Sequence, residues 1–252
     1  MLMERVVAAA QPVLKEKTVK DIVVGISLIG VELSDGTVGV AYVLRDGLPS
    51  GCSVFKYVNE IIGKPADEIA EWILTGDENI RRAIAAAVLS AAANDLELED
   101  EVTEMPFGME LTPETTVGMI GLVRPIANII KQHCKLIAFD EGLYLHGERD
   151  SIYPMSQQPE LLPECDIVIL SGTTTINGTI DGLLEMCKDA RQIIMFGPST
   201  PMYTEGWKGT GITNLAGATW DNSKKNEIFR AISLGNGVSE LGKYMIKKNV
   251  LV

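Results

Sequence analysis

The sequence predicts an α/β protein in two parts: a Rossmann-like parallel sheet in the C-terminal half and a smaller N-terminal α+β region. In the second half, short and continuously apolar runs alternate with helical patterns, which is typical of parallel strands buried on both faces. Near the N-terminus, an Asp-Gly turn between two strand-like runs indicates an antiparallel hairpin. A long alanine-rich helical pattern lies between these two regions.

The N-terminal region begins with an amphipathic helical pattern over residues 1–15. Strand-like runs follow at residues 21–26, 30–33 and 37–43, and the Ser-Asp-Gly turn separates the last two. Because Asp-Gly between alternating runs favours a tight turn, we expect a small antiparallel sheet here.

Two helices are predicted next. The first opens at Lys64-Pro65, because proline fits the first turn of a helix, and it ends near residues 75–77. Asp77 is predicted to cap the second helix, residues 78–94, which is apolar nearly all round and therefore buried. An acidic run over residues 95–104 then predicts a solvated linker, with an acidic metal-binding loop as the alternative. This change in composition predicts a domain boundary, with one domain of residues 1–105 and a second of residues 106–252.

The second half predicts five strands joined by helices in right-handed crossovers. The helices are expected at residues 125–132, 178–187 and 222–234. The strands are expected at residues 117–121, 136–139, 167–170, 192–196 and 212–218.

Composition argues against charged macromolecular partners. The 252 residues include 34 acidic and 22 basic side chains, for a net charge of −12. Such an excess opposes binding to nucleic-acid phosphates or to an anionic membrane. We expect no secretory leader, and no apolar stretch reaches the ~20 residues of a membrane span. No CxxC spacing occurs among the four cysteines, Cys52, Cys134, Cys165 and Cys187. Cys134 and Cys165 each precede an apolar run and are interpreted as reduced thiols, which indicates a cytoplasmic protein.

Ligands of open α/β sheets bind beyond the carboxyl ends of the strands, and polar loops follow four of the predicted strands. The loop at residues 171–179 offers hydroxyls at the start of a helix, which suits an anionic or strongly polar ligand. The loop at residues 197–201 is stiffened by two prolines. The predicted ligand-binding residues are Arg124, Asp140, Glu141, Ser171, Thr173, Thr174, Asn177, Gly197, Pro198, Ser199 and Thr200.

Structural alternatives stand beside these roles. Asn177 also fits a helix cap, with the threonines satisfying backbone groups. Arg124 fits either a clamp for a carboxylate or phosphate or a surface ion pair. Asp140 stands where dinucleotide folds place a ribose-binding acid, but the sequence has only a GxxG. Phosphate-binding GxxxxGK[ST] and nucleophile-elbow GxSxG motifs are absent. His133 is read as structural, whereas His146 is placed within reach of the cleft.

The second half resembles a known family, the heavy-metal chelation domains, first set apart as a domain of unknown function. The resemblance rests on the Asn177-Gly178-Thr179 and Gly197-Pro198-Ser199-Thr200-Pro201 segments, followed by Leu215-Ala216-Gly217, Asp221 and Gly235-Asn236-Gly237. The first half is similar to the N-terminal domain of enolases, through Gly30-Val31, Leu33-Ser34-Asp35-Gly36 and Ala93-Asn94. The resemblance implies a site in a cleft between the two parts, with a role in heavy-metal chelation. It does not imply enolase activity.

Three hypotheses follow. The first is a protein, with or without enzymatic turnover, that binds a small molecule or metal chelate, with Asp140 or Glu141 as acid, base or ligand of a heavy-metal ion. The second is a nucleotide- or dinucleotide-dependent enzyme without the usual fingerprint. The third is a metal-binding protein without turnover. The sequence assigns no catalytic residue and leaves the oligomeric state, a homodimer included, open.

Overall fold

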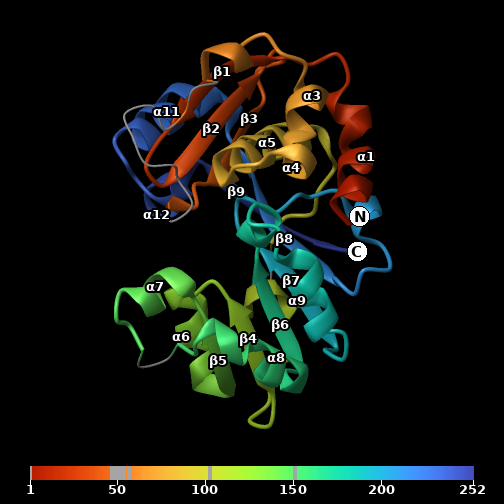
Figure 1. Ribbon diagram of the computed structural model, residues 1–252, viewed down its shortest axis with the longest axis vertical. Coiled ribbons are helices and arrows are strands. Elements are labelled where there is room, and N and C mark those ends of the chain that lie inside the picture. The colour runs from red at the N-terminus through yellow and green to blue at the C-terminus, as the bar shows by residue number, and fades with distance from the viewer. Residues whose placement is uncertain (1, 46–54, 56–57, 102–103, 150–151) are drawn as a thin grey trace.

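The computed structural model describes residues 2–45, 55, 58–101, 104–149 and 152–252. It contains a three-stranded sheet of order β1-β2-β3 and a six-stranded sheet of order β5-β4-β6-β7-β8-β9. In Figure 1 the smaller sheet lies in the upper part of the molecule and most of the larger sheet lies below it. This arrangement confirms the predicted α/β class with its separate N-terminal sheet. Cys52 lies outside the described residues.

The smaller sheet consists of β1 (Val19–Val24), β2 (Leu28–Leu33) and β3 (Val38–Tyr42), paired antiparallel as predicted. In the β2–β3 turn, the Asp35 carboxylate accepts hydrogen bonds from the Thr37 amide at 3.1 Å and the Thr37 hydroxyl at 2.8 Å. Lys17 Nζ lies 2.7 Å from Asp35. Burial alone would raise the pKa of Asp35, but the hydrogen bonds from Lys17 and Thr37 outweigh it and lower that pKa.

The N-terminal helices differ from the prediction in detail. The helix expected after Lys64-Pro65 is divided in two, and Asp77 pairs with Arg81 at 3.3 Å instead of capping the next helix. The cap position belongs to Glu78, whose side chain makes no cap bond. The helices are α1 (Leu2–Leu14), α2 (Val58–Ile61), α3 (Ala66–Ala70), α4 (Trp72–Thr75) and α5 (Asn79–Ala92).

Helix α5 packs on one face of the smaller sheet, and α11 (Lys225–Ser233), from the other end of the chain, packs on the opposite face. Gly39 allows the first contact, because a Cβ there would lie 2.1 Å from the Ala91 amide nitrogen. Gly30 allows the second, since its Cβ would lie 2.9 Å from the Ile232 side chain. Lys225 of α11 also pairs with Asp21 at 2.6 Å. The two ends of the chain therefore build this layer together.

In the larger sheet the first five strands are parallel, as predicted, and β9 is antiparallel to β8. The strands are β4 (Thr116–Ile120), β5 (Lys135–Phe139), β6 (Ile167–Ser171), β7 (Gln192–Phe196), β8 (Asn214–Trp220) and β9 (Met245–Leu251). The other helices are α6 (Arg124–His133), α7 (Glu141–Leu145), α8 (Gln158–Leu161), α9 (Ile180–Met186), α10 (Thr204–Trp207) and α12 (Val238–Leu241).

Side chains of the inner strands are buried on both faces of the larger sheet. On β6, Val168 and Leu170 face one apolar core, and Ile167 and Ile169 face another. The first of these cores continues without interruption into the N-terminal half, where it includes α1 and α5. The loops at the carboxyl ends of the central strands are consequently held against the N-terminal half by an apolar contact.

The side chains of the acidic segment are largely exposed, as predicted for a solvated linker, but its backbone is paired with the larger sheet. The Glu101 amide donates to the Lys247 carbonyl at 3.2 Å, and the Asn249 amide donates to the Glu99 carbonyl at 3.1 Å. Lys248 Nζ lies 2.6 Å from the Asp100 carboxylate. The segment thus runs along the free edge of β9, where backbone groups would otherwise be unpaired. Across the described ranges, every helix is too short or too polar to traverse a lipid bilayer.

Candidate functional site

The site predicted from the sequence lies where the strand order of the larger sheet reverses. From β4 the chain first adds β5 on one side and then β6 on the other, so the loops after β4 and β6 flank the reversal. In doubly wound sheets a ligand crevice lies at this point. A Cβ on Gly121, which has φ +85°, would lie 3.0 Å from Cβ of Ser171, so the two loops are in direct contact.

The loops after β6 and β7 are also in contact. A Cβ on Gly172 would lie 2.6 Å from the Thr200 amide nitrogen and 2.7 Å from the Ser199 carbonyl carbon. Pro198 is buried beside them. Three of the four predicted segments therefore converge, those that begin at Gly121, Ser171 and Gly197.

Most hydroxyls of this cluster already have partners within the protein. The Thr174 and Thr175 hydroxyls donate to the carbonyls of Ser171 and Gly172, each at 2.8 Å. The Ser171 and Thr173 hydroxyls lie 2.8 Å apart. The alternative that the threonines satisfy backbone groups therefore accounts for two of them.

Asn177 holds the start of the following helix without being its cap. Its Oδ1 accepts hydrogen bonds from the Thr179 amide at 3.1 Å and the Thr179 hydroxyl at 2.8 Å. Helix α9 begins only at Ile180, and the cap position is Thr179. The Asn177 side chain is exposed, and its carboxamide oxygen holds the turn before α9 from the solvent side.

Thr200 is different from the other hydroxyls of the cluster. Its side chain is 2% exposed, and its Oγ1 has no hydrogen-bond partner among the residues that the structure describes. The neighbouring Ser199, also 2% exposed, accepts a hydrogen bond from the Tyr42 amide at 2.9 Å. A buried polar atom without a partner is uncommon in native proteins and calls for an explanation.

The N-terminal half is in contact with these loops. Besides the contact from Tyr42 at the end of β3, the Arg82 guanidinium of α5 donates to the Ile176 carbonyl, to the Gly76 carbonyl at 2.6 Å and to Asn79 Oδ1 at 2.5 Å. In Figure 1 the loop after β6 lies between the two sheets. The sequence did not single out Arg82, because its loop partner lies 94 positions away.

Tyr203, just after the proline turn, also joins the halves. It is buried, and its hydroxyl donates to the Leu89 carbonyl of α5 at 2.7 Å. Burial raises the pKa of Tyr203, so this phenol stays protonated as a donor. The turn that carries Thr200 is therefore anchored to the N-terminal half at both ends.

The remaining predicted residues lie beside the cluster and have structural partners. Asp140 accepts hydrogen bonds from the Leu122 amide at 2.9 Å and the Leu143 amide at 3.0 Å, so it joins the β4 loop to α7 and caps that helix. Glu141 is exposed in the first turn of α7. Arg124 pairs with Glu148, and both side chains are exposed, at 60% and 48%. This geometry matches the surface ion pair rather than the clamp.

Comparison with known proteins gives the family. Residues 105–251, more than half of the chain, match the DUF364 family, described as "Putative heavy-metal chelation". The chain belongs to the DUF364 family. Residues 7–93 match a second family with the same description, DUF4213. The resemblance to heavy-metal chelation domains is thereby confirmed, whereas the similarity of the first half to enolases stays a prediction.

Two solved structures share the fold of this DUF364 protein. One, from Pyrococcus horikoshii, is a protein with unknown function from the same family, with a TM-score of 0.79 and 24% identity over 100% of both chains. The other, from Desulfitobacterium hafniense, has a TM-score of 0.80 and 18% identity over 100% of this chain and 98% of that one. An uncharacterized protein of Methanocaldococcus jannaschii is 33% identical over 103 residues, which cover 40% of this chain and 39% of that relative.

The family description raises the question of a metal, and the side chains at the cluster do not fit one held directly. Within the described ranges, no group of three or more His, Cys, Asp and Glu side chains is arranged to hold an ion. The cluster offers hydroxyls, which are poor ligands for soft heavy metals. Cys165 and Cys187 are buried, and burial raises their pKa values to about 11 and about 12. His133 and His146 are exposed at helix ends.

Proposed function

We propose that the protein binds a small, oxygen-rich molecule of the metal-chelator class between its two halves, at the loops after β6 and β7. The observation that carries the proposal is the buried Thr200 hydroxyl, which has no hydrogen-bond partner among the described residues. Leaving a buried hydroxyl unpaired costs about 1–3 kcal/mol. A polar ligand that supplies the missing hydrogen bond would recover this energy, which gives the site affinity for oxygen-bearing molecules.

The surroundings of Thr200 support a preorganised site. Pro198 and Pro201 restrict the backbone on either side of it, and the Thr200 amide bonds to the Gly197 carbonyl at 3.0 Å. A rigid turn loses little conformational freedom when a ligand binds. The β6 loop touches this turn, and Arg82 of the N-terminal half donates a hydrogen bond to that loop at Ile176, so a ligand between these loops would touch both halves of the chain.

The chemistry of these groups favours a chelating molecule over a bare ion. Hydroxyl groups donate hydrogen bonds to carboxylate or other oxygen atoms of a ligand, whereas heavy metals prefer thiolate and imidazole. The heavy-metal role of the family would then be carried by a ligand that itself holds the metal. The net charge of −12 supports a small-molecule partner in place of nucleic acid.

Replacing Thr200 by valine tests the proposal, because valine keeps the shape and removes the hydroxyl. The probes are citrate, citrate with Zn²⁺ or Ni²⁺, and each metal ion alone, measured by isothermal titration calorimetry and thermal shift. We expect binding of citrate or its metal complex, a loss of about tenfold or more in Thr200→Val, and recovery in Thr200→Ser.

The unliganded Thr200→Val protein should be at least as stable as the wild type, since it no longer buries an unpaired hydroxyl. Stability thereby separates loss of binding from loss of folding. The proposal is wrong if the probes leave the wild type unchanged, or if Thr200→Val binds them with unchanged affinity.

A further inference from the structure

A polar depression lies at the opposite end of the larger sheet from the proposed site, beside the amino ends of β7 and β8. Its volume is about 290 Å³. Strand β7 has five residues, so this depression is about 16 Å from the loops of the first site. The strand-end rule does not predict a ligand here, and none of the lining residues was singled out from the sequence. They are Gly108, Glu110, Arg191, Gln192, Thr213 and Asn214.

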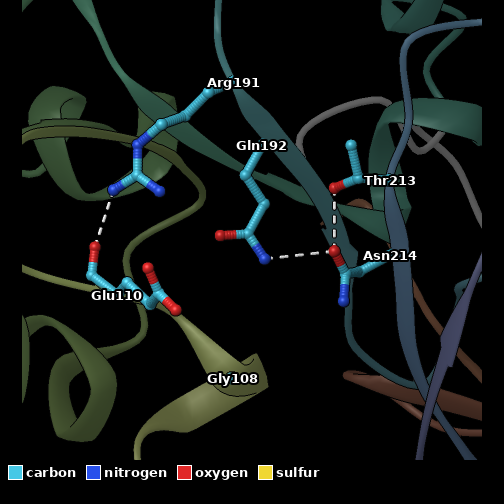
Figure 2. A pocket seen from close by; sticks show the side chains of 6 residues that line it. All are labelled: Gly108, Glu110, Arg191, Gln192, Thr213 and Asn214. Atoms are coloured by element: carbon cyan, nitrogen blue, oxygen red, sulfur yellow. Dashed lines mark hydrogen bonds between the residues drawn. The ribbon is translucent and has the colours of Figure 1, made fainter.

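Two opposite charges face this depression without pairing with each other. The Arg191 guanidinium donates one N–H to the Glu110 backbone carbonyl at 2.6 Å. Figure 2 shows the Glu110 carboxylate turned into the space between Arg191 and Gln192. Neither charged group has an ion-pair partner among the described side chains, whose ion pairs lie elsewhere. The Arg191 guanidinium and the Glu110 carboxylate therefore line the same depression, and each can pair with an opposite charge of a ligand.

A fixed amide network forms the third wall. Asn214, 4% exposed, accepts hydrogen bonds at its Oδ1 from Gln192 Nε2 at 3.1 Å and from the Thr213 hydroxyl at 2.8 Å. Because the Gln192 amide nitrogen is held by Asn214, its Oε1 points toward Glu110, as Figure 2 shows. The wall therefore presents a second acceptor on the side of Gln192 that faces Glu110.

The backbone that carries Glu110 is held in an uncommon conformation. Phe107 has φ +59° and Gly108 has φ +67°, both in the left-handed region. Phe107 is a bulky residue there, kept in place by burial, by a ring contact with Phe196 at 5.1 Å and by a hydrogen bond from its amide to Glu101 at 3.1 Å. Residues held in such conformations cluster at ligand sites.

From this arrangement we propose a second binding site, for a small zwitterion with an α-amino acid head group. The ligand carboxylate pairs with Arg191, whose planar guanidinium matches it. The ligand ammonium donates to the Glu110 carboxylate and to Gln192 Oε1. A simple anion such as phosphate would meet the Glu110 carboxylate, and a metal ion would meet the Arg191 guanidinium, so each is disfavoured.

The test uses the full chain and the twenty common amino acids, applied singly and followed by saturation-transfer NMR and calorimetry. We expect at least one amino acid to bind. Glu110→Gln and Arg191→Gln should each weaken it about tenfold or more. The matched controls remove one positive and one negative charge elsewhere, in the surface pair Lys64–Glu68, whose charged groups lie 3.3 Å apart. Lys64→Gln and Glu68→Gln should each bind the amino acid as the wild type does.

Derivatives of the bound amino acid assign the two ends of the ligand. N-acetylation removes the ammonium, so the acetylated form should bind weakly and should no longer respond to Glu110→Gln. The carboxamide should likewise no longer respond to Arg191→Gln. Failure of all twenty amino acids to bind, or equal affinity in the wild type and both variants, would overturn the proposal. Thr200→Val should leave this affinity unchanged, which separates the second site from the first.

Discussion

The contact between Gly172 and the proline turn gives the most direct test of the site geometry. A Cβ at position 172 would lie 2.6 Å from the Thr200 amide nitrogen, 2.7 Å from the Ser199 carbonyl carbon and 3.0 Å from the Ser199 carbonyl oxygen. All three atoms belong to the backbone, so no side chain can rotate away. To reach an ordinary separation of 3.4 Å, the two loops of the Gly172→Ala protein must move apart by about 0.8 Å.

The energy of this change follows from two opposing effects. Overpacking a close contact costs about 1–3 kcal/mol. Replacing glycine by alanine recovers about 0.4–1 kcal/mol, because the unfolded chain loses conformational freedom. We therefore expect Gly172→Ala to lower the free energy of unfolding by about 1–2 kcal/mol. For a chain of this size, that corresponds to a decrease in Tm of about 2–8 °C.

Urea unfolding followed by tryptophan fluorescence measures this loss. Trp207 is a suitable reporter, because its indole N–H donates to the Pro201 carbonyl at 2.9 Å, next to the turn. Gly182 of α9 is the matched control, since nothing lies within 4 Å of a Cβ there. Gly182→Ala should raise stability by about 0.5–1 kcal/mol, as alanine does within helices.

Equal stability of Gly172→Ala and the wild type would refute the close contact of the two loops. A loss of similar size in Gly182→Ala would show that the effect arises from alanine itself and not from the contact. The first result would require the converging loops of the proposed site to be placed differently.

Three further predictions concern other parts of the molecule. Arg82→Met should lower the free energy of unfolding by about 2–3 kcal/mol and speed amide hydrogen exchange around Ile176. Arg82→Lys should recover only part of this loss, because lysine lacks the planar guanidinium. Unchanged exchange around Ile176 would contradict the hydrogen bond from Arg82 that joins the two halves. Asp35 has a lowered pKa in the folded state, so its stabilising effect is present above its ordinary pKa of 3.8 and is lost as pH falls through the folded value. The stability difference between wild type and Asp35→Asn should accordingly narrow in acid, and a difference constant from pH 7 to pH 2 would rule the linkage out. Burial raises the pKa values of Cys165 and Cys187 to about 11 and about 12, so both thiols should resist iodoacetamide at pH 8 in the folded protein and react in urea. Peptide mass spectrometry detects the alkylated cysteines. Rapid alkylation of the folded protein would contradict this prediction.

Local patterns predicted most of the fold. Apolar runs located the five parallel strands, and the Asp-Gly turn located the N-terminal hairpin, because both signals depend on neighbouring residues. Strand β9 was missed, since its Lys247-Lys248-Asn249 centre carries the charges of a sheet edge and lacks an apolar run. The acidic segment was predicted to be solvated, and its side chains are largely exposed, but no local signal indicated that its backbone pairs with β9.

The candidate site was predictable in position but not in detail. The strand-end rule selected the loops that contain Ser171 and Gly197, and these do converge. Which hydroxyls are already paired depends on backbone carbonyls that only the folded turn brings close, so Thr174 and Thr200 looked alike in the sequence. The role of Arg82 depends on a contact between distant parts of the chain, and no local signal marks it.

The position of α11 determines whether the two family segments of this chain can fold when they are expressed separately. The segment matching the first family, residues 7–93, contains the small sheet and only one of the two helices that cover it. The second helix, α11, belongs to residues 105–251, the segment matching the other family. Expressed alone, the first segment would expose Leu28, Val38 and Val40 to water.

The two segments are therefore interleaved in space although they are consecutive in sequence. A cut at the acidic connection would yield fragments that must reassociate to become soluble, as in split reporter proteins. An exchange of one segment between homologues would also have to preserve the surface of α11 that meets the small sheet. This shared layer gives a physical reason for the two segments to be inherited together.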